Sequence, residues 1–458
     1  MITRTIAQVA EMANAQLSLP TNDSILVKGV TIDTRKIQGN ELYVPLVGTN
    51  VDGHQFVRQA YEQGAAASFW KKDVPNPPAD IPLLFVDDPL LAMQQLATAY
   101  RNQLDVQIIG ITGSNGKTST KDIVAQLLSA KYKVQKTLGN YNSQQGLPLM
   151  LLSIEEDTDI MVLEMGMSAL GQISRLTQMA QPNVAILTNI GESHLEELGS
   201  RENIATAKFE ITEGLSEHGL FVYDGDEPLL QAKLAEQTPS YKIKSFGMQK
   251  DADVYPISMN LVDNGTTFTC NLLEGAVHLP VLGLHQVKNT LAAITVATHL
   301  GVSEAEINQQ LASLQLTGMR METIDGIHDA LIINDAYNAS PTSMKAAIQL
   351  LDELDTYEKK IVFVADMLEL GKDEVDFHKQ IGAYIAQTSI THVFSYGNLA
   401  KHITDHIDSL QTNQVTQHVL EKDQVIDKLL QILDHNTVLL LKGSRGMKLE
   451  EVLPSLTK

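Results

Sequence analysis

The stretch that decides the fold is GITGSNGKTST, residues Gly110 to Thr120. The run QIIGI leads into it like a buried strand, and the residues after it carry apolar side chains at helical spacing, at Ile123, Leu127 and Leu128. A glycine-rich turn between a strand and a helix directs backbone N–H groups at an anion, and the helix N-terminus adds positive potential. The turn therefore predicts a phosphate-binding loop.

Side chains in this loop suit a nucleoside triphosphate. We expect Lys117 to contact the terminal phosphates and Thr118 to ligate Mg²⁺. The spacing departs from the common G-x-x-x-x-G-K-[ST] pattern, because Ile111 stands where that pattern has glycine. The alternative is an ordinary glycine turn, which the flanking strand and helix disfavour. The residues predicted to bind the nucleotide here are Gly113, Ser114, Asn115, Gly116, Lys117, Thr118 and Ser119.

Length and composition exclude several classes of protein. The 458 residues suggest about three domains at roughly 150 residues each. A net charge of −21 argues against a general nucleic-acid binder, which needs a basic face. No apolar run is long enough to span a membrane, and the first residues lack the pattern of a signal peptide. Because Cys270 is the only cysteine, a disulfide framework is excluded and a cytoplasmic location is favoured.

The chain divides into three regions of alternating strand and helix patterns, which predicts an α/β fold. We expect a small N-terminal α/β domain over 1–104, a central P-loop domain with a mostly parallel sheet over 105–316, and a C-terminal Rossmann-like open α/β domain over 317–458. The third sheet is expected to be smaller than the central one. The main predicted elements of the last two regions are strands at 160–164, 184–189, 330–335, 360–366, 392–397 and 437–443, and helices at 289–300, 303–314 and 343–354.

Two polar residues follow apolar strands of the central region. Glu164 ends one strand, and His194 ends the loop after another. Both are therefore expected at the carboxyl edge of the sheet, where ligands bind in open α/β folds. A carboxylate and an imidazole there could hold a second metal beside Thr118. The alternative for either residue alone is a polar group with no ligand.

Six further segments carry a family resemblance. They are LEMGM (163–167), TNIGESHLEELGS (188–200), AKFEI (207–211), GLHQVKNTLAA (283–293), NDAYNASPTSM (334–344) and ADMLELG (365–371). With the phosphate loop they resemble the Mur ligases, the ATP-dependent amide-forming enzymes of peptidoglycan precursor synthesis, over the whole chain. The last two segments look like the members that add D-Ala-D-Ala to a UDP-N-acetylmuramoyl-tripeptide through an acyl phosphate. The resemblance thus implies ATP and Mg²⁺ as cofactors, these two substrates, and a role in cell-wall biogenesis.

The resemblance also implies roles for individual residues. It makes Lys117, Lys208, His194 and Glu164 catalytic, and Thr118, Glu164, His194 and Lys208 metal-holding. Lys208, which by spacing alone would be a solvent-facing helix residue, is the lysine expected to carry a carbamate formed from CO₂.

Further implied contacts concern ATP and come from two regions. Asn289 is expected to read the adenine edge from the start of a helix, with His285 supporting the same loop. The alternative for both residues is a role in capping the helix or in a turn. Arg320 is expected on the triphosphate, its alternative being a surface salt bridge. Asp335 is placed on the ribose.

The implied substrate contacts lie in all three regions. Thr34 and Arg35 would contact the UDP-sugar, although a polar hairpin remains their alternative. Asn140 and Asn142 would hold the muramoyl or peptide portion, and Tyr337 and Asn338 lie where the dipeptide is expected. No role follows for the loop Lys442–Glu450.

Two other functions stay open at this point. A folylpolyglutamate synthetase-like ligase would lack the first domain and the segment NDAYNASPTSM. A non-catalytic nucleotide switch would use its phosphate loop only to change shape. We expect a monomer.

Overall fold

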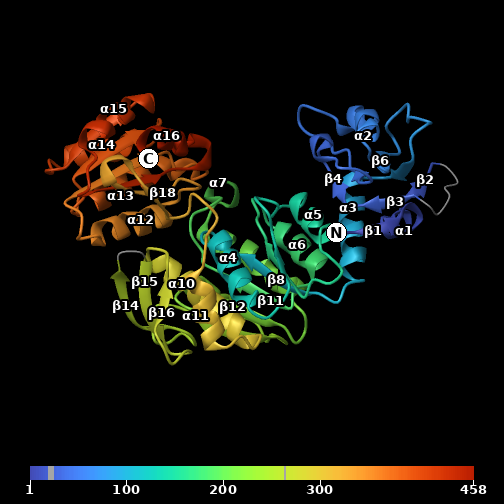
Figure 1. The fold of residues 1–458 in the computed structure, drawn as a ribbon, viewed down its shortest axis with the longest axis horizontal. Coiled ribbons are helices and arrows are strands. Elements are labelled where there is room, and N and C mark those ends of the chain that lie inside the picture. The colour runs from blue at the N-terminus through green and yellow to red at the C-terminus, as the bar shows by residue number, and fades with distance from the viewer. Residues whose placement is uncertain (19–24, 263–264) are drawn as a thin grey trace.

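The computed structural model describes residues 1–18, 25–262 and 265–458. Figure 1 shows three α/β regions, with the first and third standing at opposite ends of the central one. The predicted α/β class, with parallel sheets, is confirmed. In the described part of the chain, no helix is both long and apolar enough to cross a bilayer.

The central region is built on a parallel six-stranded sheet in the order β13-β12-β11-β8-β10-β9. Its strands are β8 (Gln107–Thr112), β9 (Val134–Lys136), β10 (Ile160–Glu164), β11 (Val184–Leu187), β12 (Leu220–Asp224) and β13 (Lys242–Phe246). The helices on its two faces are α4 (Lys117–Leu128), α5 (Gly146–Leu152), α6 (Gln172–Ala180), α7 (Leu195–Leu198), α8 (Arg201–Phe209), α9 (Pro228–Ala235), α10 (Leu284–His299) and α11 (Glu304–Ala312). A small antiparallel sheet comprises β14 (Pro256–Val262), β15 (Gly265–Cys270) and β16 (Val277–Leu279).

Helices cover both faces of this sheet, which explains why its strands read as continuous apolar runs. In β8, Ile108 packs into the core formed with α5 and α6, whereas Ile109 and Ile111 pack into the core formed with α4 and α10. Strand β8 therefore lies in the middle of the sheet, and the loop that follows it emerges at the carboxyl edge.

The C-terminal sheet also has six strands in the described residues, so the prediction of a smaller sheet was wrong. Its order is β17-β18-β22-β19-β20-β21, and only β17 runs antiparallel to its neighbour. The strands are β17 (Glu322–Asp325), β18 (Leu331–Asp335), β19 (Lys359–Ala365), β20 (His392–Tyr396), β21 (Val415–Val419) and β22 (Thr437–Lys442). Edge strand β17 is mostly exposed and edge strand β21 is mostly half-buried, and neither has an apolar run, which is why the sequence pattern missed them.

Helices α12 (Pro341–Glu353), α13 (Glu374–Ile385), α14 (Lys401–Ser409), α15 (Asp423–Ile432) and α16 (Leu453–Leu456) complete the third region. Ser340 caps α12 through a capping box, and Pro341 occupies its first turn. Because α12 follows β18, its N-terminus lies at the carboxyl edge of this second sheet, as α4 does in the first.

The N-terminal region contains a five-stranded sheet in the order β2-β7-β6-β5-β4 and a two-stranded pair, β1-β3. Its elements are β1 (Thr3–Thr5), α1 (Ile6–Met12), β2 (Gln16–Leu17), β3 (Leu26–Lys28), β4 (Val30–Thr31), β5 (Leu42–Tyr43), α2 (Val57–Glu62), β6 (Ala67–Lys71), β7 (Leu83–Val86) and α3 (Pro89–Arg101).

Helix α3 joins this region to the central one through a shared apolar core. Buried residues of α1 and α3 belong to the same cluster as those of α5 and α6. Tyr100 Oη donates to the carbonyl of Ile154 at 2.8 Å, and Arg101 Nε donates to that of Ala180 at 2.9 Å. The first region is thus packed onto the central one rather than tethered to it.

Candidate active site

The loop between β8 and α4 is held rigidly by the strand beside it. Gly113 and Gly116 have φ angles of 150° and 80°, a region that favours glycine. A Cβ on Gly113 would lie 1.8 Å from Thr188 Oγ1. The N–H groups of Ser114 and Asn115 donate to the backbone carbonyl and side-chain oxygen of Asn189, at 3.0 and 2.9 Å. The shape of the turn is therefore fixed by residues that follow β11.

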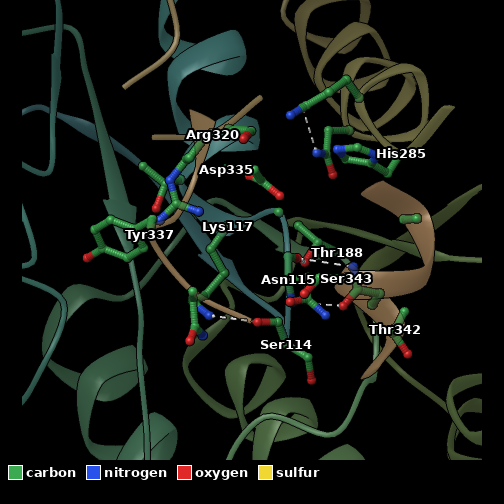
Figure 2. Close-up of a pocket in the computed structure, with 18 of the residues that line it drawn as sticks. Ser114, Asn115, Lys117, Thr188, His285, Arg320, Asp335, Tyr337, Thr342 and Ser343 are labelled. Atoms are coloured by element: carbon green, nitrogen blue, oxygen red, sulfur yellow. Dashed lines mark hydrogen bonds between the residues drawn. The ribbon is translucent and has the colours of Figure 1, made fainter. Parts of the chain in front are cut away.

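This loop opens into a cavity of about 220 Å³ between the central and third regions. Figure 2 shows Tyr337, Arg320 and Lys117 together at one side, and Thr342 and Ser343 at the other. The sequence-predicted residues that line the cavity are Ser114, Asn115, Gly116, Lys117, Thr118, Ser119, Asn142, Glu164, His285, Asn289, Arg320, Asp335, Tyr337 and Asn338. Residues far apart in the sequence, from Ser114 to Asn338, are thus brought together between the carboxyl edges of the central and third sheets.

Thr118, Glu164 and Asn142 form one hydrogen-bonded set in the cavity. The Thr118 hydroxyl donates to Glu164 Oε2 at 2.8 Å, and Asn142 Nδ2 donates to Oε1 at 2.8 Å. Glu164 is 4% exposed, so its carboxylate is presented by β10 in a nearly dry setting. A hydroxyl and a carboxylate at this separation provide the hard oxygen ligands that Mg²⁺ prefers.

Two lysines share one acceptor behind the loop. Lys117 Nζ donates to the carbonyl of Gly113 at 2.7 Å, and Lys208 Nζ donates to the same carbonyl at 3.0 Å. Burial lowers the pKa of both ammonium groups, that of Lys208 to well below its ordinary range, and the charge of Lys117 lowers it further. The prediction of a solvent-facing Lys208 from spacing alone is wrong, since this residue is 2% exposed.

Arg320 lies on the same side of the cavity as Lys117 (Figure 2). Its guanidinium lies 4.2 Å from the ring centroid of Tyr337, and its buried Nε has no hydrogen-bond partner among the described residues. No ion pair involving Arg320 occurs in the described chain, so the alternative of a surface salt bridge is not observed. A half-buried guanidinium without a carboxylate partner favours an anionic ligand.

His194 lies elsewhere. It begins α7 with a φ of 64°, and its Nδ1 is 3.0 Å from Glu369 Oε2 of the third region. Neither His194 nor Lys208 is among the residues that line the cavity. The predicted grouping of His194 with Glu164 therefore needs a movement of the loop that carries His194.

Helix α10 begins at Leu284, five residues earlier than predicted, so Asn289 lies one turn inside it. The start was missed because Gly283 supplies no side-chain cap. Asn289 Nδ2 donates to Gln286 Oε1 at 3.1 Å, and the Asn289 side chain abuts Gly116. Neither His285 nor Asn289 caps the helix, which removes that alternative for both.

Sequence reasoning missed Lys442 as a cavity residue. Its ammonium is 2.5 Å from Asp335 Oδ2 and donates to the carbonyl of Asn338 at 3.1 Å. Lys442 ends β22, the strand next to β18. The strand-end argument that found Glu164 could have found it too. Thr188, Asn189, Gln286, Lys288, Ser343 and Ala346 also line the cavity and were not predicted.

The residues predicted to contact the UDP-sugar lie in the first region, on the 3₁₀ turn Thr34–Lys36. Arg35 pairs with Asp33 at 2.9 Å and keeps 84% of its side chain exposed. Lys36 Nζ lies 2.5 Å from the hydroxyl of Tyr141, in the loop that holds Asn140 and Asn142. The turn thus approaches the loop that reaches Glu164, although Thr34, Arg35 and Asn140 do not line the cavity itself.

Comparison with known proteins agrees with this architecture. The Mur ligase family, catalytic domain matches residues 26–101, the Mur ligase middle domain residues 111–297, and the Mur ligase, glutamate ligase domain residues 319–445. The UDP-N-acetylmuramoyl-tripeptide–D-alanyl-D-alanine ligase of Bacillus subtilis is 45% identical over 456 residues, covering 100% of this chain and 99% of the relative. The chain belongs to the Mur ligase family.

Other members of the family match along their whole length. The Escherichia coli ligase of the same name is 32% identical, with 100% of this chain and 99% of that protein covered. Among solved structures, MurF from Acinetobacter baumannii superposes with a TM-score of 0.90 at 28% identity, covering 99% of this chain and 98% of the other. MurF from Thermotoga maritima in complex with ADP gives 0.83 at 27% identity, covering 94% and 97%.

The structure of a folylpolyglutamate synthase from Mycobacterium tuberculosis superposes with a TM-score of 0.59 at 16% identity. The superposition covers 78% of this chain and 92% of the synthase chain. At that identity only the fold is shared. The alternative of a folylpolyglutamate synthetase-like ligase is therefore not favoured.

Proposed function

We propose that this Mur ligase uses ATP to join D-alanyl-D-alanine to the free carboxylate of a UDP-N-acetylmuramoyl-tripeptide, an amide-forming step of peptidoglycan synthesis. The observation that carries the proposal is the phosphate loop, set in a cavity between two regions of a chain that aligns end to end with ligases so named. On this proposal, 1–104 holds the UDP-sugar, 105–316 holds ATP, and 317–458 holds the dipeptide. The enzyme would work as a cytoplasmic monomer.

The cations of the cavity suit the first chemical step. A carboxylate in water is a poor acceptor for an amine, so it is activated by transfer of the γ-phosphoryl group to give an acyl phosphate, which the amine then attacks. Two anions must approach each other for this transfer. Lys117, Arg320 and the N-terminus of α4 provide positive potential where those charges meet, and their fixed positions cost no reorganisation.

Mg²⁺ fits the donor set of this site. Thr118 and Glu164 would hold it, because their oxygens already converge in a nearly dry part of the cavity. When bound, the ion neutralises phosphate charge and orients the phosphates. His194 would join these ligands only after leaving Glu369.

Lys208 is proposed to be carbamylated. A neutral amine adds to CO₂ and loses a proton to give the carbamate anion, and the lowered pKa of Lys208 supplies that neutral amine. We expect Lys208→Ala to lose most of its activity and to regain part of it with added acetate or formate. Absence of any rescue by short carboxylates would remove the carbamate from the proposal.

The remaining contacts are those that the family resemblance implies. Asn289 lies beside the phosphate loop and is assigned to adenine, and Asp335 is assigned to the ribose. Tyr337 and Asn338 would contact the dipeptide from the third region. Thr34 and Arg35 would bind the UDP-sugar, with Asn140 and Asn142 holding the portion that extends toward Glu164.

The test measures phosphate release with ATP, Mg²⁺, UDP-N-acetylmuramoyl-tripeptide and D-Ala-D-Ala, omitting each substrate in turn. Release that requires all of them, with formation of a UDP-linked pentapeptide, is the expected result. Tripeptides ending in lysine and in diaminopimelate are compared in parallel to identify the third residue. Nucleotide binding without any amide product would instead indicate the non-catalytic switch.

A further inference from the structure

The segment that connects the central and third regions is anchored on the helix that follows the phosphate loop. Between α11 and β17, the N–H and hydroxyl of Thr317 both donate to Asp122 Oδ2, at 3.0 and 2.7 Å. Asp122 lies on α4, which begins with Lys117. The connection is therefore fixed to the phosphate-binding element where it leaves the central region.

Asp122 is built to hold that anchor. It is 1% exposed, and its other oxygen accepts from Lys136 Nζ at 2.7 Å and lies 3.4 Å from Lys121 Nζ. Burial would raise the pKa of Asp122, but the charge of Lys121 and the hydrogen bonds from Lys136 and Thr317 outweigh burial and lower it. The carboxylate is thus an ionised acceptor with both oxygens occupied, placed by α4 itself.

The same segment is anchored at its other end in the third region. The N–H of Met321 donates to Asp335 Oδ1 at 3.2 Å. Between the anchors, Met319 and Met321 both adopt left-handed backbone, with φ of 61° and 53°. Such conformations are unfavourable for residues with side chains and persist where the surroundings enforce them.

Arg320 stands between these two strained residues. Its guanidinium lies over Tyr337, and its buried Nε has no hydrogen-bond partner in the part of the chain that the structure describes. Arg320 lines the same cavity as Lys117 (Figure 2). The direction of this side chain is set by a short strap, Thr317–Met321, held at one end by the phosphate-loop helix and at the other by the third region.

We infer that Asp122 and Thr317 are positioning residues that act through Arg320. Their contact fixes the distance from the phosphate loop at which Arg320 enters the cavity, so that the guanidinium meets the transferred phosphoryl group when both regions engage it. This inference rests on the proposed function, since it assigns Arg320 to that group. It adds that the carboxylate of Asp122, outside the cavity, affects kcat for phosphate release through the position of Arg320.

The test removes the hydroxyl of Thr317. Thr317 is exposed, so Thr317→Val should fold, and it keeps the backbone N–H bond to Asp122. We expect kcat for phosphate release to fall roughly ten-fold, because small misplacement of a catalytic group is costly, with little change in KM for the UDP-tripeptide. Thr317→Ser restores the hydroxyl and should recover most of the rate. Ser313→Ala is the matched control, since its hydroxyl accepts from Gln126 of α4 at 3.3 Å but lies before the strap.

A double-mutant cycle separates positioning from general structural damage. If Thr317 acts through Arg320, Thr317→Val should cause no further loss of kcat in an Arg320→Ala background. Single-turnover phosphate release follows the alanine variant if its steady-state turnover is too low to measure. An unchanged kcat in Thr317→Val, or the same ten-fold loss in both backgrounds, would overturn the inference. Failure of the wild-type protein to release phosphate would instead refute the proposed function.

Discussion

Replacing Lys208 by methionine is expected to stabilise the protein while abolishing its ligase activity. Methionine keeps the length of the side chain and removes its charge. Lys208 Nζ and Lys117 Nζ donate to the same neutral carbonyl, and no carboxylate pairs with Lys208 in the described residues. Burying this amine costs free energy whether it stays charged or gives up its proton, because no carboxylate compensates it and Lys117 lies near it. Such a residue is retained for function at the expense of stability.

The size of the gain follows from these contacts. Replacing buried charged groups by well-packed apolar ones stabilises proteins by about 1–4 kcal/mol. Loss of the hydrogen bond from Lys208 to the carbonyl of Gly113 reduces this gain by about 1 kcal/mol. The carbonyl is not left without a partner, because Lys117 still donates to it. A net gain of about 0–3 kcal/mol remains, which in a chain of 458 residues should raise the apparent melting temperature by about 3 °C at most.

The effect should depend on pH with a defined sign. Burial, followed by the charge of Lys117, lowers the pKa of Lys208 in the folded protein below its unfolded value of about 10.4. The unfolded chain then binds more protons between these two pKa values, so wild-type stability rises with pH through that window. The advantage of Lys208→Met is therefore larger at pH 7 than at pH 9 and shrinks as pH approaches 10.

Thermal melts in CO₂-depleted, metal-free buffer at pH 7 and pH 9 would measure both effects, with phosphate release followed in parallel. Lys401→Met, at an exposed position on α14, is the control and should leave the melting temperature nearly unchanged. A fall in melting temperature for Lys208→Met, or a gain that does not shrink with pH, would refute the reasoning.

Three further outcomes are expected. Glu164→Gln, which keeps the shape of the side chain and removes its charge, should lower kcat by about 100-fold or more with a melting temperature close to that of the wild type; near-normal turnover would remove Glu164 from the site. In Gly113→Ala, the new Cβ would lie 1.8 Å from Thr188 Oγ1, so the stabilisation of the protein by added ATP in thermal melts should disappear, and a wild-type shift would contradict a rigid loop. Hydrogen bonds from Lys359 and Thr437 lower the pKa of Asp434 to about 2, below its unfolded value of about 3.9; stability from this group is therefore present above pH 4 and lost as pH falls toward 2, and Asp434→Asn should flatten acid unfolding in that window.

Short-range patterns predicted much of the fold. The strands β10 and β18–β20 were found to within about two residues, because both faces of each are covered and the apolar run is continuous. Helix α12 (Pro341–Glu353) was predicted at 343–354, within two residues of its observed bounds. Polar edge strands β17 and β21 were missed, because neither has an apolar run.

The site was predictable where it depends on strand ends and failed where it depends on contacts between regions. Glu164 ends β10, and Thr118 lies in the first turn of α4, just after β8; the two meet because β8 and β10 are parallel neighbours with their carboxyl ends at one edge. The pairing of His194 with Glu369 joins the central and third regions outside the cavity, and no local pattern encodes it.

By itself, the sequence determined the phosphate loop, the alternation of strands and helices, and the motifs that mark a Mur ligase. These depend on steric and hydrogen-bonding preferences within a few residues, which act wherever the chain folds. The tertiary structure alone decided that Lys208 is buried beside Lys117, that Asp122 anchors the strap carrying Arg320, and that the third region completes the cavity. Such features arise from packing between segments that are distant in the sequence. Burial lowers the pKa of Lys208, and the placement of the third region determines where Arg320 lies in the cavity.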